Sequence, residues 1–441
     1  MKILLVCSCF APKNVIGAVR LTKIAKYFIR KDHEVTVISP ELEKYDKIDN
    51  SLECEELEQA QRITIQYSAI TRKLTALHSN QGKQASSSEV ANQVNKSIKS
   101  RIYKALRTCF AVWRDIEWSL KAKRAIKKNA SSYDVVISSY PNASTHDAAL
   151  FAKRIGKAKV WIADFRDPMV LESFEADKHT RLVRKQTQIV KNADMVTHVS
   201  KNGSEHFVCR VEDRHKVLWL PNGFDNDDFT AISSETSDHT DNCVVFSHAG
   251  GLYHGERDCS PLFRAIWELI NAHEITSEDV RFDYAGPDYG ILRKQADKYG
   301  LAAITRNLGI IPRPEALRMQ NESDCVVVAT FCYSDNGGAM TGKVYEPVLM
   351  RRPILMLVNG SGKNSEPGEF VKYLQAGTVY EAANDGDDVT NIKKMILALK
   401  DEKAKYHHTT SRMNEEKRED YNYNRLVDTL IDYVNQATRT L

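Results

Sequence analysis

Apolar and polar positions alternate along the first half of the chain in a way that predicts strands and helices in turn. Residues 2–7 and 34–39 are short, β-branched apolar runs, and the segment between them has helical spacing, at Leu21, Ile24, Ala25 and Phe28. Four further apolar runs follow, at 134–138, 159–163, 194–199 and 217–220. Runs of this kind are typical of strands buried on both faces of a parallel sheet. The first half therefore predicts one doubly wound α/β sheet.

A second alternation begins after a polar, acidic stretch at 225–242, which we expect to be a linker. Its expected strands lie near 244–247, 280–284, 325–328 and 354–358. Its expected helices lie near 261–272, 290–299, 314–321 and 343–350. Two successive α/β units of similar size predict two Rossmann-like domains, 1–224 and 243–410, facing each other across a cleft. The last segment, 411–441, is expected to form a helical strap with one polar face.

An irregular insertion at about 70–130 interrupts the first domain. Its early part, Gln81–Ser88, predicts a mobile loop. Its later part, 96–128, holds eleven Lys or Arg against two Asp or Glu, interleaved with Ile102, Leu106, Phe110, Trp113 and Trp118. Two interpretations stay open for this part: a solvated helical pair packed on the sheet, or a basic amphipathic helix that lies on an anionic membrane.

The bulk composition adds mainly exclusions. With 441 residues, 42% hydrophobic and 27% charged, the chain has room for two ordinary globular domains. A net charge of only +4 gives no reason to expect nucleic acid as a partner. No window approaches the ~20 apolar residues that span a bilayer, and the opening run Met1–Cys7 is too short for a secretion signal. The nine cysteines have no zinc-like spacing, so we expect reduced thiols in a cytoplasmic protein.

Glycine and charged residues follow several expected N-terminal strands, at the edge where α/β sheets bind ligands. Gly17, in Ile16-Gly17-Ala18, stands at a helix start, where a residue without Cβ lets a backbone amide approach an anion. The segment Trp161-Ile-Ala-Asp164-Phe165-Arg166-Asp167-Pro168 follows another strand. Arg166 can bind a phosphate or a hydroxyl but cannot shuttle protons near neutral pH. The structural alternative is an ion pair of Arg166 with Asp164 or Asp167.

The C-terminal half carries two segments of similar character. Ser247-His-Ala-Gly250-Gly251 ends one strand and leads through Arg257 to an expected helix, and Gly337-Gly-Ala-Met-Thr341-Gly342-Lys343-Val-Tyr-Glu346-Pro leads into another. Arginine can donate two hydrogen bonds to phosphate oxygens, and amides at a helix start can meet the same group. A carboxylate such as Glu346 can accept hydrogen bonds from two hydroxyls. Capping or a buried pair is the structural alternative for Glu346.

In this order and over most of the chain, these segments resemble the retaining glycosyltransferases of family 4, and among them a branch of bacterial surface-polysaccharide assembly. The resemblance implies the GT-B fold, a UDP- or GDP-sugar as co-substrate, a glycan or lipid-linked acceptor, and no metal ion. It implies donor-binding roles for Gly17, Gly250, Arg257, Asp335, Thr341, Gly342, Lys343 and Glu346. It implies catalytic roles for Arg166, Asp167 and Asp164. Such an enzyme works in the cytoplasm, and at the inner membrane face if the basic insertion binds lipid.

The chain departs from the family's pattern at three positions. Arg166 stands where many members have a histidine, Gly251 where a basic residue usually helps to clamp the diphosphate, and Gly338 where a glutamate usually contacts the donor sugar. Lys343 is the candidate for the missing charge, and Asp335 is the nearest carboxylate candidate for the missing contact. Two alternative functions therefore stay open: a sugar-nucleotide epimerase, and a catalytically silent GT-B scaffold.

Two further polar features have simple structural interpretations. His146 falls within an expected helix, where a structural role is the simpler interpretation. The acidic cluster Asp225-Asn-Asp227-Asp228 has the residues of a metal site, but we interpret it as the entry to the linker.

Overall fold

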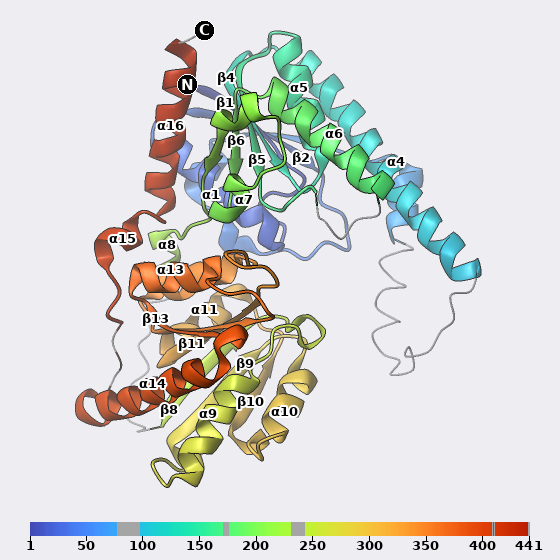
Figure 1. Cartoon of the computed structure of the whole chain (residues 1–441). Coiled ribbons are helices and arrows are strands. Elements are labelled where there is room, and N and C mark those ends of the chain that lie inside the picture. Colours follow the sequence, from blue (N-terminus) through green and yellow to red (C-terminus); the bar gives the residue numbers. More distant parts are fainter. Residues whose placement is uncertain (77–97, 171–175, 231–242, 408, 410, 440–441) are drawn as a thin grey trace. The chain divides into compact units, whose positions relative to one another are not determined.

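The computed structural model of the chain describes residues 1–76, 98–170, 176–230, 243–407, 409 and 411–439 (Figure 1). The chain divides into two compact units. Unit 1 comprises Met1–Val199, Ser204–Leu220 and Val427–Leu441, and unit 2 comprises Ser200–Gly203 and Pro221–Leu426. The loop expected at 81–88 and the linker residues 231–242 lie outside the described residues.

A seven-stranded parallel sheet forms the centre of unit 1. Its strands are β1 (Lys2–Val6), β2 (Glu34–Pro40), β3 (Gln61–Ile65), β4 (Tyr133–Tyr140), β5 (Ala158–Phe165), β6 (Met195–His198) and β7 (Val217–Trp219). They lie in the order β3-β2-β1-β4-β5-β6-β7, and the pairings between them are parallel. This is a doubly wound order, in which the direction of winding reverses between β1 and β4.

Helices cover the sheet of unit 1 on both faces. They include α1 (Ile16–Arg30), α2 (Glu55–Glu58), α4 (Ile98–Lys128), α5 (Ala143–Arg154), α6 (Ala176–Asn192) and α16 (Tyr423–Arg439). Figure 1 shows α4, α5 and α6 running side by side. The basic segment forms one long helix, α4, rather than a helical pair, and part of it joins the core through Trp118, Ala122 and Ile126. Among the described residues, no helix has the length and apolar character needed to span a bilayer.

Unit 2 repeats the same winding with six strands. These are β8 (Val244–Ala249), β9 (Val280–Ala285), β10 (Thr305–Gly309), β11 (Cys325–Phe331), β12 (Ile354–Asn359) and β13 (Gly377–Glu381), in the order β10-β9-β8-β11-β12-β13. All the pairings between them are parallel. The sheet therefore reverses its winding between β8 and β11, as the first sheet does between β1 and β4. The two Rossmann-like sheets predicted from the sequence are confirmed.

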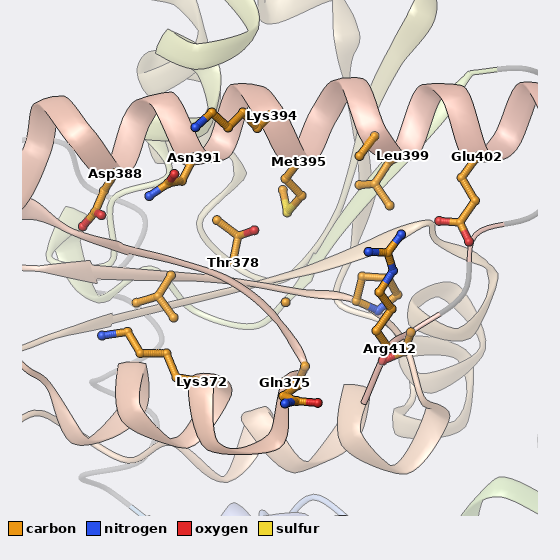
Figure 2. Close-up of a pocket in the computed structure, with 16 residues that line it drawn as sticks. Lys372, Gln375, Thr378, Asp388, Asn391, Lys394, Met395, Leu399, Glu402 and Arg412 are labelled. Atoms are coloured by element: carbon orange, nitrogen blue, oxygen red, sulfur yellow. The ribbon is translucent and has the colours of Figure 1, made fainter. Parts of the chain in front are cut away.

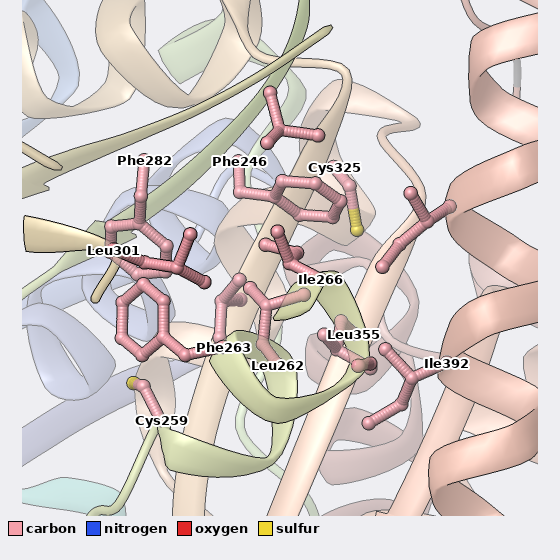
Figure 3. Packing of buried hydrophobic residues seen from close by; sticks show 14 of the residues in the cluster. Phe246, Cys259, Leu262, Phe263, Ile266, Phe282, Leu301, Cys325, Leu355 and Ile392 are labelled. Atoms are coloured by element: carbon pink, nitrogen blue, oxygen red, sulfur yellow. The ribbon is translucent and has the colours of Figure 1, made fainter. Parts of the chain in front are cut away.

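The helices of unit 2 pack on both faces of this sheet. They are α8 (Asn226–Thr230), α9 (Ser260–Asn271), α10 (Tyr289–Asp297), α11 (Arg313–Glu322), α12 (Tyr345–Met350), α13 (Glu366–Leu374), α14 (Asp385–Tyr406) and α15 (Glu415–Glu419). Figure 3 shows the core between the sheet and helices α9 and α14, where Phe263 of α9 meets Phe282 of β9 and Ile392 of α14 lies near Leu355 of β12. The rings of Phe263 and Phe282 lie 5.5 Å apart.

The C-terminal segment differs from the single strap expected at 411–441. It is divided into α15 and α16, because residues 420–422 turn away to meet the chain at Phe224, whose N–H donates to Tyr421 O. The last helix, α16, contributes the buried Val427, Leu430 and Val434 to unit 1, where Asp428 also pairs with Lys31 at 2.8 Å.

Arg418 of α15 is fully buried and holds the end of α12. Its Nε donates to Val348 O at 2.8 Å and its Nη2 to Leu349 O at 3.2 Å. The guanidinium lies 4.2 Å from the ring centroid of Phe224. Carbonyls in the last turn of a helix have no partner within the helix, so Arg418 acts as a side-chain cap for α12.

Candidate functional site

The turn after β8 holds a glycine that no other residue can replace without moving a lysine. Gly250 has a φ of +131°, and a Cβ built on it would stand 1.2 Å from Lys343 Nζ. Its N–H donates to Ala285 O, and its carbonyl accepts from the Tyr284 hydroxyl at 2.7 Å. The turn is therefore fixed by β9 and leaves room for the Lys343 side chain.

Lys343 reaches this turn from the short 3₁₀ turn that precedes α12. Its Nζ donates to Ala249 O at 2.8 Å. Burial lowers the pKa of Lys343 to about 8; Glu346 and Asp288 act to raise it, and Arg257 lowers it further. The structure thus brings Gly250, Arg257, Lys343 and Glu346, all predicted donor-binding residues, to one end of the sheet of unit 2.

Arg257 is the second cation here, and it is mostly buried. Its Nη1 donates to Gly251 O at 3.2 Å, and its guanidinium lies 4.1 Å from the ring centroid of Tyr253. Its Nε is buried without a hydrogen-bond partner in the described part of the chain. Burial lowers the pKa of Arg257, although an arginine stays charged.

The loop that carries Arg257 has a strained backbone. Tyr253 and His254 have φ values of 48° and 56°, in the left-handed region that non-glycine residues rarely adopt. Strain of this kind persists only where the surroundings enforce it, and it gathers at ligand-binding sites. Asp288 helps to hold this loop, because its carboxylate accepts a hydrogen bond from Leu252 N at 2.7 Å.

No carboxylate pairs with either cation. Among the described residues, neither Arg257 nor Lys343 forms an ion pair, and the charge of Arg257 lowers the pKa of Lys343. Burying charge without a counter-ion is unfavourable unless something else compensates. This end of unit 2 is therefore suited to an anionic ligand.

Glu346 and Thr341 stand at the start of α12. Glu346 Oε2 accepts from Gln320 Nε2 at 2.9 Å, which fixes the carboxylate and leaves Oε1 without a partner among the described residues. Thr341 caps the turn, because its Oγ1 lies 3.4 Å from Lys343 N. The amide of Lys343, expected from the sequence to face phosphate, is thus partly occupied by this cap. Gly342 begins the 3₁₀ turn.

Asp335 is held by a different loop. Its Oδ1 accepts from Lys363 N at 2.9 Å, and its side chain is exposed. Gly338, where the resembling family has a glutamate, has a φ of +111°, and a Cβ there would lie 2.9 Å from Pro367 Cδ. A side chain at 338 is thus excluded by the backbone and by Pro367.

His248 stands in the segment Ser247-His-Ala-Gly250 but was not singled out from the sequence, because its burial beside the two cations depends on the fold. It lies at the end of β8 and is buried; its Nδ1 lies 2.9 Å from Val327 O, and its Nε2 has no partner in the described residues. Burial lowers its pKa to about 3, with Lys343 and Arg257 acting in the same direction. The ring is therefore neutral near pH 7, with Nε2 as a free acceptor if Nδ1 carries the proton.

Asp164 is the centre of a buried network in unit 1. Arg20 of α1 donates to its two oxygens through Nε at 3.2 Å and through Nη2 at 2.9 Å. Ser139 Oγ and Thr197 Oγ1 also donate to it, at 2.9 and 2.8 Å. Burial alone would raise the pKa of Asp164, but Arg20 and these hydroxyls hold it below its usual value. A carboxylate so fully engaged is suited to positioning its neighbours.

Arg166 pairs with neither Asp164 nor Asp167, so the ion-pair alternative was wrong. The arginine that pairs with Asp164 is Arg20. Arg166 Nε donates to Ser139 Oγ at 3.0 Å and to Tyr140 O at 2.9 Å. A Cβ on Gly17 would meet Arg166 Nη1 at 2.3 Å. The two Nη groups, which have no hydrogen-bond partner in the part of the chain described, therefore lie over the start of α1. Asp167 is exposed next to Arg166.

His146 has the structural role that the sequence favoured. It is buried among Tyr140, Phe165 and Trp161, with Nδ1 2.8 Å from Ser138 Oγ. Burial lowers its pKa to about 3, so it is neutral near pH 7.

The acidic cluster before the linker is used for turns. Asp225 is buried and accepts from Asp227 N at 3.1 Å, and Asp228 pairs with Arg313 at 3.0 Å. Within the described residues no group of three or more His, Cys, Asp or Glu is arranged to hold a metal ion. Metal independence stays a prediction.

A hollow elsewhere in unit 2 contains none of the predicted site residues. Figure 2 shows it between α13 and α14, with Thr378 of β13 between the two helices. Its volume is about 830 Å³. Its position beside the edge strand separates it from the end of the sheet where Arg257 and Lys343 meet.

Solved structures match the chain over its whole length, although sequence comparisons find nothing. No family model matches, and no curated protein sequence does. Anabaena HepE in complex with UDP and glucose aligns with a TM-score of 0.59 at 14% identity, over 99% of this chain and 100% of the other. The lipopolysaccharide outer core galactosyltransferase WaaB aligns with a TM-score of 0.56 at 11% identity, over 99% of each chain.

The chain has the GT-B fold.

The same GT-B fold also occurs in a neighbour of another activity. A Listeria monocytogenes protein assigned as a UDP-N-acetylglucosamine 2-epimerase aligns with a TM-score of 0.53 at 11% identity, over 100% of this chain and 97% of the other. At such identities the GT-B likeness establishes the fold alone. The activity has to be argued from the site.

Proposed function

We propose that this GT-B chain is a glycosyltransferase that moves a sugar from a nucleotide-sugar donor to a glycan or lipid-linked acceptor, with retention, in surface-polysaccharide assembly. The observation that carries the proposal is that two cations, Arg257 and Lys343, lie near Gly250 at the end of β8 and have no acidic partner among the described residues. A nucleoside diphosphate is the anion that best fits two cations and a carboxylate at the ligand-binding end of a doubly wound sheet. Solved neighbours with UDP and glucose, or with ADP, support this choice.

The chemistry follows from where charge develops. As the bond between sugar and diphosphate breaks, negative charge grows on the leaving phosphate, and Arg257 and Lys343 stabilise it without having to reorganise. Glu346, fixed by Gln320, offers Oε1 to the ribose hydroxyls. Arg166, anchored through Nε, has its Nη groups available for a phosphate or a sugar hydroxyl. We assign Asp164 the task of holding Ser139, on which Arg166 rests.

A thermal-shift panel tests the donor site first. We expect one of UDP, GDP, ADP or CMP to stabilise the wild type, by about 2.7 kcal/mol at 100 times its dissociation constant. The shift should disappear in Glu346→Ala and in Arg257→Met. Glu315→Ala, which changes an exposed glutamate of unit 2, is the control and should keep the shift. If none of the four nucleotides shifts the melting temperature, the transferase proposal fails in favour of a silent scaffold.

A second measurement separates transfer from epimerisation. Mass spectrometry of the sugar-nucleotide pool should show release of nucleoside diphosphate only when an acceptor is present. An epimerase would interconvert the sugar nucleotide with no acceptor, and that result would overturn the proposal while leaving the donor site intact. The lipid-linked form of the acceptor would be met at an anionic membrane face, and the part of the chain suited to such a face is α4.

A further inference from the structure

An apolar stripe on α4 is exposed in the described part of the chain. Five large apolar side chains on this helix are between 49% and 64% exposed: Leu106, Val112, Trp113, Ile116 and Leu120. Their spacings of three, four and seven residues place them on one face of the helix. At 1.5 Å per residue the stripe from Leu106 to Leu120 is about 21 Å long.

Three residues of the stripe, Leu106, Trp113 and Leu120, lie on the side of α4 that is turned away from the core. Trp118, Ala122 and Ile126 are at most 2% exposed and pack into the core of unit 1. These residues are turned well over a quarter of a revolution away from Leu106, Trp113 and Leu120, at 100° per residue. Figure 1 shows the N-terminal end of α4 extending past α5 and α6.

The acidic and basic residues in the described part of α4 have different surroundings. Its two carboxylates are both engaged by unit 1: Asp115 accepts from Asn142 Nδ2 at 2.9 Å, and Glu117 accepts from Ser68 N at 2.6 Å. Four basic residues are exposed, and among the described residues none of them forms an ion pair: Arg107, Arg124, Lys127 and Lys128. The exposed surface of the described part of α4 thus combines apolar side chains with basic side chains that have no acidic partner there.

We propose that this stripe, with its basic rim, docks the chain on an anionic lipid surface. An exposed tryptophan within an apolar stripe is suited to the headgroup boundary, and basic side chains beside it attract anionic lipid. Each Lys or Arg near such a surface strengthens binding about five-fold. A second copy of the chain fits less well, because it would bring one positive rim against another. The inference rests on the proposed function in one respect only: a lipid-linked acceptor is what would require the enzyme to bind a membrane.

Vesicle co-sedimentation of the full chain tests the proposal. We expect binding to phosphatidylcholine vesicles with about 30% phosphatidylglycerol to exceed binding to phosphatidylcholine alone by ten-fold or more, since four basic residues contribute. Trp113→Ser with Ile116→Ser, and separately Arg124→Glu with Lys128→Glu, should each abolish that excess. The matched controls are Trp267→Ser, 44% exposed on α9, and Arg293→Glu with Lys294→Glu on α10; both should bind like the wild type.

The outcomes are distinct from those of the donor-site test. Equal binding to both kinds of vesicle, or unchanged binding in both α4 variants, overturns the membrane proposal. So does a wild-type dimer that Trp113→Ser with Ile116→Ser converts to a monomer in light scattering, since the stripe would then be covered by a second copy. The nucleotide-dependent thermal shift should persist in every α4 variant, so loss of vesicle binding alone leaves the proposed transferase standing.

Discussion

At the scale of single residues, the charge of Lys343 is the feature most open to measurement. It is partly buried, the charge of Arg257 acts on it, and its pKa is lowered to about 8. A bound diphosphate favours the charged form, so binding is strongest while the amine is protonated. Below pH 8 that condition holds in the free protein. As the pH rises through 8, the proton has to be taken up on binding and affinity falls.

We therefore expect nucleoside diphosphate affinity to fall about ten-fold or more between pH 7 and about 9.5, the worth of one charge-assisted contact. Titration calorimetry at several pH values measures it. Lys343→Met should bind the nucleotide more weakly than wild type at pH 7 and equally at high pH. The ratio of the two affinities is the quantity to follow, because any titration of the nucleotide itself affects both proteins alike. A ratio that stays constant across this range would contradict the role given to Lys343.

Asp164 supports a second expectation at this scale. Replacing it with asparagine leaves Arg20 buried without its counter-ion, which should cost unit 1 about 3 to 5 kcal/mol. Urea unfolding followed by circular dichroism measures the loss. Asp167→Asn, three residues away and exposed, is the matched control and should change stability by less than about 0.5 kcal/mol.

The pH dependence of the same pair has a definite sign. Because the pKa of Asp164 is held below its usual value, its contribution is present above the ordinary carboxylate range and is lost as the pH falls through the folded-state value. The difference in stability between wild type and Asp164→Asn should therefore shrink in acid. A difference that grows below pH 4 would argue against a charged Asp164 in the folded state.

The sequence could not predict which residues contact each other in the candidate site. Arg20 stands two residues after the segment Ile16-Gly17-Ala18, yet its pairing with Asp164 joins residues 144 positions apart and depends on α1 lying against β5. The meeting of Lys343 with Gly250 spans 93 positions along the chain, and is fixed by the position of α12 relative to the end of β8. Local pattern carries the type of a residue, whereas its partner is set by the fold.

At the scale of elements, prediction succeeded for the enclosed strands and failed at three of the four edge strands; the fourth, β7, was predicted at 217–220. Every strand inside either sheet reads as an apolar run, because both faces are covered. The strands missed were β3, β10 and β13, which are all edge strands. In β10 (Thr305–Gly309) no residue is fully buried, so its sequence has no reason to be continuously apolar.

Helix α12 is an element whose short length makes it depend on a cap. It has six residues, its N-terminal end carries Glu346, and Arg418 holds its last carbonyls. Arg418→Lys keeps the charge but cannot reach both Val348 O and Leu349 O with one planar group. We expect a loss of about 1 to 3 kcal/mol in the stability of unit 2, and weaker nucleotide binding through displaced Glu346 and Lys343.

Calorimetric melting and nucleotide titration of the same variant measure these two effects. Arg425→Lys is the matched control, since Arg425 pairs with Asp420 at the surface and its side chain is 60% exposed. Reduced stability with wild-type nucleotide affinity would show that Arg418 supports the fold without positioning α12.

At the scale of the whole molecule, the main part of unit 2 begins at Pro221, and the chain returns to unit 1 at Val427; Ser200–Gly203 also belongs to unit 2. Unit 2 is therefore inserted in the sequence of unit 1. A chain ending at Leu426 keeps all of unit 2 but loses the buried Val427, Leu430 and Val434 from unit 1. Each such side chain stabilises by about 1.5 to 3 kcal/mol when fully buried, so unit 1 should be strongly destabilised.

Differential scanning calorimetry with and without nucleotide tests whether the two units unfold independently. We expect the truncated chain to show a lowered or absent transition for unit 1 and a preserved transition for unit 2 that the nucleotide still raises. A single transition that falls as a whole would mean that the two units unfold together.

The position of α16 also makes the order of synthesis differ from the order of completion. A ribosome adds about 5 to 20 residues per second, and residues 221–426 have all been made before residues 427–439 follow. Unit 2 can close its core while unit 1, although begun first, still lacks its last helix. A nascent chain halted near residue 426 would thus carry a finished second unit beside an unfinished first one, whose uncovered apolar face is a natural substrate for a chaperone.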